Sequence, residues 1–522
     1  MRKRNVLQFI VLLSILAVGT VALKPVGEIL PGNPRAHWGS LAVLPAEAAG
    51  TIYVDASATG AETGVNWNRA FTKLQDALEA ASSGDQIWVA VGVYYPDEGS
   101  APTDDDPLTT FTLKNGVAVY GGFAGTESTL GERDWVANVT VLSGDLEQDD
   151  TTNPDGVVTD VADIAGTNAY HVVKGGGTNS SAVLDGFTIT AGRANGLNQY
   201  YGGGMENLSS SPTLSNLNFS GNWADHNGGG MRNYQSSPAL TNVSFNGNKA
   251  SSGGGMNNYA SSSPTLTDVS FNGNEAGIGG GMENSSSSPT LTNVSFTGNN
   301  AIQAGGGMAT NTGNPTLMNV TFSGNQAMGG GGMYNSSCSL SLTNVRFSGN
   351  QADNGGGMYN NNISLELTNV SFSGNRASIS GGGMYNVNLT TSYFLHIILW
   401  NNGGGQIINS ASSPTIAYSI LEDCIDSGGF WVTQCGINSA GNLDTDPLFV
   451  TPIDPATAPT TAGDLHLQFG SPAVDSGYNP FCPPTDLDGY TRPIDGDLDG
   501  SADCDMGAYE KTIDLFLPLI MR

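Results

Sequence analysis

The chain has few charged residues and very few basic ones. Only 12% of its 522 residues are charged, and 18 Lys and Arg stand against 47 Asp and Glu, for a formal net charge of −29. Such an acidic surface repels nucleic acid and anionic lipid headgroups, so neither is expected as a partner. The low charge density also argues against a solvated, disordered chain.

Other features are missing as well. The five cysteines include no CxxC pair, which argues against a zinc site. After residue 23 no stretch is long and apolar enough to cross a bilayer. No 3.6-residue period appears, and Pro, Gly, Asn and Ser dominate the middle of the chain, so helical repeats are disfavoured.

The N-terminus has the layout of a secretory signal. Three basic residues at positions 2–4 precede an apolar run from Val6 to Leu23. A retained transmembrane anchor is the alternative. The small-x-small rule fits two cleavage sites, one at residues 17–19 and one at residues 46–48. We therefore assign residues 1–49 to a leader and predict export.

In an exported chain, cysteines that are near in sequence are expected to pair. This predicts two disulfides, Cys424 with Cys435 and Cys482 with Cys504. Cys338 is left over. It falls where other repeats carry Ser, in what we expect to be a polar loop.

The centre of the chain repeats itself every 25 or 26 residues. A GGGM motif places Met at 205, 231, 256, 282, 308, 333, 358 and 384. An F-x-x-N motif lies between successive copies. Self-similarity at this period marks a repeat architecture in which each unit packs on the next.

The pattern within one unit favours short strands. Leu217 and Phe219 are two residues apart and share one face of a strand, whereas Leu214 requires a bend at Ser215-Asn216 to face the same way. Asn recurs at three points of the unit and indicates turns, because Asn tolerates left-handed dihedrals. The sequence thus predicts an all-β fold: a right-handed parallel β-helix with three short strands per coil.

Stacked coils place equal residues above one another, so the repeat predicts ladders inside the coil. The Met column is expected to be core rather than a soft-metal site. The predicted aromatic ladder is Phe219, Phe245, Phe271, Phe296, Phe322, Phe347 and Phe372. The predicted amide ladder is Asn222, Asn248, Asn274, Asn299, Asn325, Asn350 and Asn375.

The alternation of GGGM with FSGN resembles the GGA and FxxN repeats of the polymorphic outer-membrane protein family, over residues 185–405. That resemblance implies a right-handed β-helix involved in adhesion. The chain departs from the family after Gly405, where no segment resembles the family's membrane domain, so a different export route is expected.

Residues 50–184 are expected to cap the array and form its first, irregular coils. An apolar stripe of Phe71, Leu74, Leu78 and Ala81 predicts an amphipathic capping helix over residues 69–82. Strands are predicted at 86–91 and 93–95. This opening resembles that of bacterial pectate-lyase-like β-helix proteins.

The repeat loosens over residues 406–441, and a different segment follows. Residues 442–510 resemble a choice-of-anchor Q type domain, on matches that include Gly470-Ser471-Pro472-Ala473, Arg492-Pro493 and the run Asp505 to Glu510. The resemblance implies surface attachment or sorting and no catalysis. The apolar tail at 511–522 has two interpretations, a sorting signal or a last strand.

One acidic loop has the beginning of a calcium-binding pattern. Alternate carboxylates and a Gly follow D-x-D-x-D-G, although position twelve is Met506 instead of Glu. The alternative is an acidic surface turn. The candidate ligands are Asp495, Asp497, Asp499 and Asp503. The acidic segments 104–106 and 145–150 are weaker candidates.

Charged residues in the repeats give no catalytic site. Lys249, Glu275 and Arg376 share one position of the unit with Trp223, Asn300, Gln326 and Gln351, which is typical of a variable outward turn. Asp225-His226 with Arg232 is the best local cluster, and we assign no catalytic residue. The only cofactor that the sequence suggests is calcium.

The sequence therefore predicts an exported protein at the bacterial cell surface or outer membrane, with adhesion or carbohydrate binding as its role. Its expected partners are extracellular glycans or cell-surface components, and the membrane only through export or anchoring. A polysaccharide lyase or hydrolase is the alternative, with Arg133 and Asp134 in the irregular coils as its candidate residues. A self-assembling surface-layer component is the third hypothesis.

Overall fold

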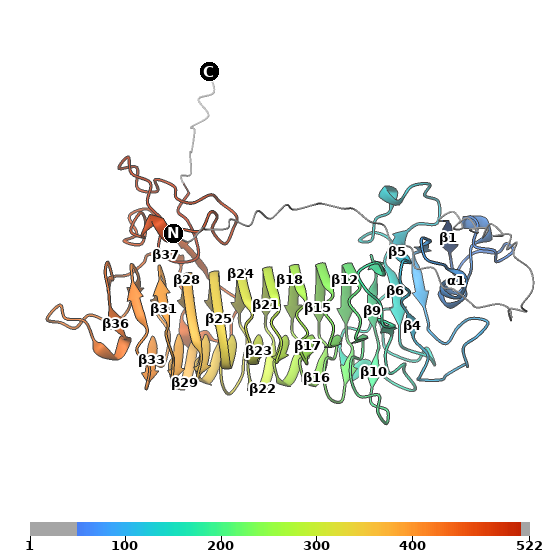
Figure 1. Cartoon of the computed structure of the whole chain (residues 1–522), viewed down its shortest axis with the longest axis horizontal. Coiled ribbons are helices and arrows are strands. Elements are labelled where there is room, and N and C mark those ends of the chain that lie inside the picture. The colour runs from blue at the N-terminus through green and yellow to red at the C-terminus, as the bar shows by residue number, and fades with distance from the viewer. Residues whose placement is uncertain (1–49, 513–522) are drawn as a thin grey trace, which may run out of the picture. The chain divides into compact units, whose positions relative to one another are not determined.

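A computed structural model describes residues 50–512. Its strands stack side by side along one axis as a parallel β-helix, with the first coils at one end and the last at the other (Figure 1). This confirms the predicted right-handed parallel β-helix, built from connections of the usual hand. The predicted leader, residues 1–49, and residues 513–522 of the predicted C-terminal tail lie outside the described residues. Between residues 50 and 512 no helix has the length and apolar content needed to cross a membrane.

Each regular coil holds three strands, one for each side of the coil. The longest strands form sheet 1, which comprises β12 (Thr213–Ser220), β15 (Ala239–Asn246), β18 (Thr265–Asn272), β21 (Thr290–Thr297), β24 (Thr316–Ser323), β25 (Met333–Ser348) and β28 (Ser364–Ser373). β25 is long enough to continue from sheet 2 into sheet 1.

The two other sides of the coil carry shorter strands. Sheet 2 contains β11 (Met205–Leu208), β14 (Met231–Tyr234), β17 (Met256–Tyr259), β20 (Met282–Ser285), β23 (Met308–Gly313), β27 (Met358–Asn361), β30 (Met384–Val387) and β33 (Ile407–Ser410). Sheet 3 contains β10 (Arg193–Ala194), β13 (Trp223–Ala224), β16 (Lys249–Ser252), β19 (Glu275–Ile278) and β22 (Asn300–Ala304), followed by the pair β26 (Gln351–Asn354) and β29 (Arg376–Ser380).

Irregular coils flank the regular ones. Those before them contain β1 (Thr51–Val54), α1 (Leu74–Ala80), β2 (Gln86–Ala90), β3 (Gly92–Tyr94), β4 (Phe111–Thr112), β5 (Ala118–Phe123), β6 (Thr140–Ser143), β7 (Val173–Lys174), β8 (Val183–Asp185) and β9 (Thr188–Thr190). Those after them contain β31 (Tyr393–Leu395), β32 (Ile398–Trp400), β34 (Thr415–Ala417), β35 (Ile420–Leu421), β36 (Ile437–Asn438), β37 (Phe449–Thr451) and β38 (Asp464–Leu467).

The capping helix is shorter than predicted. It begins at Leu74 instead of residue 69, because Phe71 is extended and its N–H donates to the carbonyl of Tyr53. A separate 3-10 turn covers Trp67–Arg69. The apolar stripe survives in the shorter helix, which buries Leu74, Ala77 and Leu78 against the first coil.

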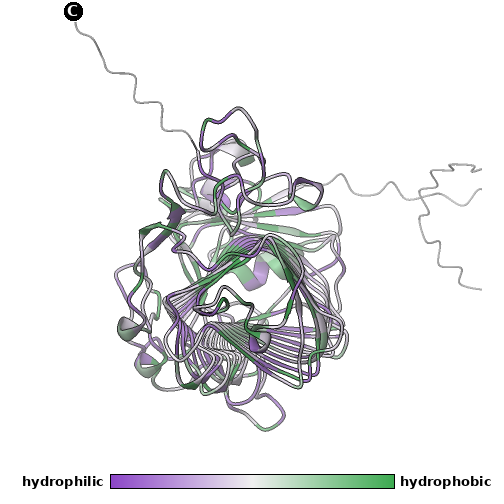
Figure 2. Cartoon of the chain, turned by 90° about the vertical axis from the view of Figure 1, so that its left-hand side faces the viewer, coloured by the Kyte–Doolittle hydropathy of each residue, from purple (hydrophilic) through white to green (hydrophobic). Residues whose placement is uncertain are grey.

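The core is a stack of identical side chains. Neighbouring Phe rings such as Phe271 and Phe296 have centroids 4.8 Å apart and are nearly parallel. Viewed along the axis, successive coils superimpose and enclose this core (Figure 2). Because every coil is in register with the next, one residue type fills one column, which is why the sequence repeats.

Only one of the three Asn positions fulfils the prediction of a left-handed turn. Asn242 has φ of 54° and bends β15 between Thr241 and Val243, and equivalent residues such as Asn293 do the same. In the SGN turn the left-handed residue is the Gly, whereas the Asn points inward. The Asn two residues after the Met of GGGM, which is replaced by Thr310 in one coil, also points inward. These two positions therefore build amide ladders rather than turns.

The predicted environment of Cys338 is also wrong. We expected a polar loop, but it lies within β25 in register with Gly313, and its side chain is buried in the core. The two predicted disulfides are confirmed, with Cys424 bonded to Cys435 and Cys482 to Cys504.

Candidate functional site

A straight row of small polar side chains runs along the outer face of sheet 1. Strand residues alternate between core and exterior, and the middle outward position of each coil lies in register with the next. The row is formed by Asn218, Ser244, Ser270, Ser295, Thr321 and Arg346. Since adjacent strands lie ~4.8 Å apart, a hydroxyl or amide recurs at that interval up to Arg346, which interrupts the column before Ser371.

The left-handed residues form a second polar row beside the first. Asn242 donates an amide N–H to the Oδ1 of Asn216 at 2.7 Å, and Asn293 donates to Asp268 at 3.0 Å. These bonds fix the side chains along the rod. Ser295 and Thr321, by contrast, line a surface cavity, and no side-chain hydrogen bond within residues 50–512 engages their hydroxyls. Both hydroxyls can therefore donate to a ligand.

Trp135 closes the N-terminal end of these rows. It lies in the connection between β5 and β6 and is 37% exposed. The guanidinium of Arg133 lies 5.0 Å from the ring centroids of both Trp135 and Tyr120, and it donates to the Asp185 carboxylate at 2.8 Å. Asp185 also accepts from the hydroxyl of Ser215. The buried ion pair therefore ties the Trp135 loop to sheet 1.

The segment after β36 closes the C-terminal end. Arg346 donates to the phenol oxygen of Tyr509 at 3.1 Å, and the ring of His466 packs on Tyr509 with centroids 4.1 Å apart. Both ring nitrogens of His466 face carboxylates, Nδ1 that of Asp464 and Nε2 that of Asp488. Burial opposes the imidazolium, but these two hydrogen bonds outweigh it and raise the pKa of His466.

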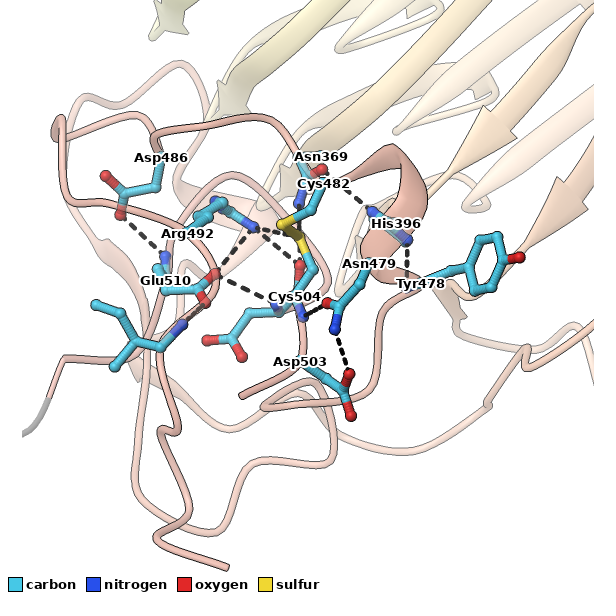
Figure 3. The surroundings of a disulfide bond; sticks show 12 residues. Asn369, His396, Tyr478, Asn479, Cys482, Asp486, Arg492, Asp503, Cys504 and Glu510 are labelled. Atoms are coloured by element: carbon cyan, nitrogen blue, oxygen red, sulfur yellow. Dashed lines mark hydrogen bonds and ion pairs between the residues drawn. A yellow bond between two sulfur atoms is a disulfide. The ribbon is translucent and has the colours of Figure 1, made fainter. Parts of the chain in front are cut away.

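A buried polar network holds this C-terminal wall in place (Figure 3). Arg492 forms a fully buried ion pair with Glu510 at 3.1 Å and donates to two backbone carbonyls. Asn369 of β28 donates to the carbonyls of Asp505 and Gly507. The run Asp505 to Glu510, which we matched to an anchor-type domain, thus packs directly on the β-helix.

The two walls flank the outer face of sheet 1, and a surface cavity lies beside each of them. A cavity of about 220 Å³ lies beside Trp135 and reaches Ser270, and one of about 540 Å³ lies beside Tyr509 and reaches Ser295. Ser270 and Ser295 are register neighbours, so the two cavities share a continuous floor. We call this surface the saddle, with the row from Asn218 to Arg346 as its floor.

The predicted ladder residues lie inside the coils and not in the saddle. Asn248 is fully buried, and its amide donates to Asn274 at 3.0 Å and to the carbonyl of Phe219 at 2.9 Å. The other Asn residues of the amide ladder are equally buried and make equivalent hydrogen bonds. The Phe residues of the aromatic ladder are buried in the core as well. They hold the scaffold together, and no ligand can reach them without unfolding a coil.

The charged residues considered in the repeats lie elsewhere. Arg232 stacks on Tyr201 at 3.8 Å and pairs with Glu206 at 3.0 Å, while His226 packs on Tyr200. Asp225 is exposed. The variable position occupied by Lys249 and others is an outward row on sheet 3, away from the saddle.

The structure gathers only part of the predicted calcium loop. Carboxylate oxygens of Asp495 and Asp497 lie within 4.8 Å of each other and of Asp475, which the sequence analysis did not select. Asp499 instead accepts from the N–H of Ser501, and Asp503 accepts from the amide of Asn479.

The candidate residues of the enzyme hypothesis have structural roles. Arg133 is held by Asp185 and by the carbonyl of Gly121, and its side chain is mostly buried. Asp134 accepts from the backbone N–H groups of Val136 and Ala137 and so shapes the loop that presents Trp135.

Sequence reasoning missed the walls of the saddle. Arg346 carried a signal, because it interrupts a column of Asn, Ser and Thr. Trp135, Tyr509 and His466 carried none, because their approach to sheet 1 depends on loops whose path the repeat does not dictate.

Comparisons with known proteins add little. No family model matches the chain, and no curated protein matches it in sequence. A solved pectate lyase is similar with 12% identity and a TM-score of 0.36, covering 89% of this chain and 97% of that one. A rhamnogalacturonan lyase is similar with 9% identity and a TM-score of 0.33, covering 67% and 87%. The fold assignment rests on the strand registers described above.

Proposed function

We propose that this protein is displayed at the bacterial cell surface and binds an extended glycan chain in the saddle. The observation that carries the proposal is the continuous polar floor between an exposed Trp at one end and a Tyr–His–Arg group at the other. The predicted leader and the anchor-like residues 442–510 support an extracellular location.

The chemistry of the floor suits sugars. Hydroxyl and amide groups both donate and accept, as sugar hydroxyls do. Their spacing of ~4.8 Å along the rod is close to the length of one residue in an extended polysaccharide. One chain lying along the rod would therefore meet an equivalent group at each coil, so that many weak hydrogen bonds add up.

The two walls would fix the orientation of a glycan on the floor. Trp135 presents an aromatic face on which the apolar side of a sugar ring can stack, and Arg133 fixes that face from behind. At the other end Arg346 and Tyr509 offer a cation and a phenol. Ligand pockets commonly combine one aromatic surface with a few placed polar groups.

Glycan binding is best tested by a substitution that places a bulky side chain in the floor of the saddle. Ser295→Arg should abolish glycan binding, measured by calorimetry with ligands identified on a glycan array. The equivalent position in a later coil is Arg346, so the substitution is compatible with the fold. Asn300→Arg is the matched control, because its row on sheet 3 already carries Lys249 and Arg376. Equal affinity for both variants would contradict the proposal.

The same preparations decide between binding and cleavage. New reducing or unsaturated ends after incubation with polyuronates and neutral glycans would establish a lyase or hydrolase instead. We expect intact glycans. The cation next to Trp135 is the guanidinium of Arg133, which is paired with Asp185 and has no lone pair with which to remove a proton from a sugar.

A further inference from the structure

A carboxylate triad lies in the irregular coils, outside the saddle. Asp97 follows β3, and the loop that continues from it brings back Asp104 and Asp105. One carboxylate oxygen from each of the three lies within 4.8 Å of the others. Proximity of exposed acids is common, so the triad alone indicates no ligand.

The environment of Asp97 provides a second observation. Asp97 is only 5% exposed, and its buried Oδ1 has no hydrogen-bond partner. Its other oxygen accepts the N–H of Asp105, at 3.1 Å. No ion pair within the described residues reaches Asp97, and Lys73 pairs with the next residue, Glu98, at 2.6 Å. A buried carboxylate oxygen with no donor is unfavourable unless something else neutralises it.

The other two triads have enclosed carboxylates with more hydrogen-bond donors. In Asp145, Asp149 and Asp150, the buried carboxylate of Asp145 accepts backbone N–H groups on both oxygens. In the triad of Asp475, Asp495 and Asp497, Asp475 accepts three N–H groups. The carboxylates of Asp145 and Asp475 are therefore satisfied by backbone donors. The Oδ1 of Asp495 also has no hydrogen-bond partner, but Asp495 is half-buried, whereas Asp97 is only 5% exposed.

We propose that Asp97, Asp104 and Asp105 bind a divalent cation, Ca²⁺. The ligands are all carboxylate oxygens, which hard cations prefer, and two of the three lie on an exposed loop where water can complete the coordination. A loop of this kind suits the variable geometry of Ca²⁺ better than the strict octahedron of Mg²⁺. This inference is independent of glycan binding.

Tyr95 makes the site observable. Tyr95 stands only two residues before Asp97 in the chain, directly after β3. A Tb³⁺ ion at the triad should therefore emit when Tyr is excited, and Ca²⁺ should displace it.

The experiment uses the full chain freed of metal with chelator and then titrated with Tb³⁺ and with Ca²⁺. Wild type should show Tyr-sensitised emission and a rise in Tm with Ca²⁺. Asp97→Asn should lose both, and in chelator it should be at least as stable as wild type, because no buried charge remains. Asp104→Asn removes an exposed ligand without touching the core and should weaken Ca²⁺ binding roughly tenfold or more. Asp225→Asn is the control at an exposed acid outside every triad.

Two results would overturn the proposal. Unchanged Tb³⁺ emission and Ca²⁺-dependent Tm in both Asp97→Asn and Asp104→Asn would show that the triad holds no ion. Loss of the signal in Asp149→Asn but not in these variants would place the ion at the neighbouring triad.

Discussion

Asn284 lies in register with Thr310, and no hydrogen bond joins their side chains. In the coils on either side the same inward position is Asn, and each amide donates to the next at about 2.8–3.0 Å. Thr310 therefore divides one amide ladder into two. It leaves the Nδ2 of Asn284 without an acceptor and the Oδ1 of Asn335 without a donor.

Replacing Thr310 with Asn should join the two halves and stabilise the protein. Two buried hydrogen bonds at about 1 kcal/mol each predict a gain of about 1–2 kcal/mol, visible as a higher Tm by calorimetry. Asn284→Thr, which widens the gap, should lower Tm. A Tm that falls for Thr310→Asn would mean that this coil cannot accept the amide found in its neighbours.

A substitution in the middle of the aromatic ladder should lower the free energy of unfolding strongly. Phe296 is fully buried and stacks on Phe271 and Phe322 at 4.8 Å. Phe296→Ala should cost about 3–5 kcal/mol in unfolding free energy, since the cavity breaks a continuous column. Phe430→Ala, at a residue 72% exposed, should change it by less than about 0.5 kcal/mol. Similar losses for the two variants in denaturant unfolding would disprove the role of the ladder.

Glu283 should make stability depend on pH. Burial raises its pKa to about 8, although the amide of Asn257 donates to it. Between the unfolded value of 4.5 and about 8, the native state holds a proton that the unfolded state has released, so stability falls as pH rises. Glu283→Gln should remove this loss, and its advantage in Tm over wild type should be larger at pH 9 than at pH 5. Parallel Tm profiles for the two proteins would refute the assignment.

Arg133 should be needed for the N-terminal wall. Arg133→Met leaves the mostly buried Asp185 without its cation, and breaking a buried pair in this way costs about 3–5 kcal/mol. The hydroxyl of Ser215 and the amide of Asn216 still donate to Asp185, so the lower part of that range is expected. Chemical denaturation measures the loss. The double variant Arg133→Met/Asp185→Leu should recover most of it, and a double variant as unstable as the single one would contradict the explanation.

The sequence by itself determined the β-helix, because the solenoid is a local fold. Each coil contacts its neighbours in register, so a column such as Phe219 to Phe372 must appear in the sequence as a period of 25 or 26 residues. The disulfides also followed from sequence, since Cys424 and Cys435 are only 11 residues apart.

Only the tertiary structure decided the candidate sites. Arg346 meets Tyr509 across 163 residues, and Trp135 reaches a floor that extends to Ser270. These contacts depend on how loops outside the repeat fold back on sheet 1, which no period encodes. The same holds for Asp97, whose Oδ1 is buried without a hydrogen-bond donor. This is a property of the packed first coils and cannot be recognised from the spacing of acidic residues in the sequence.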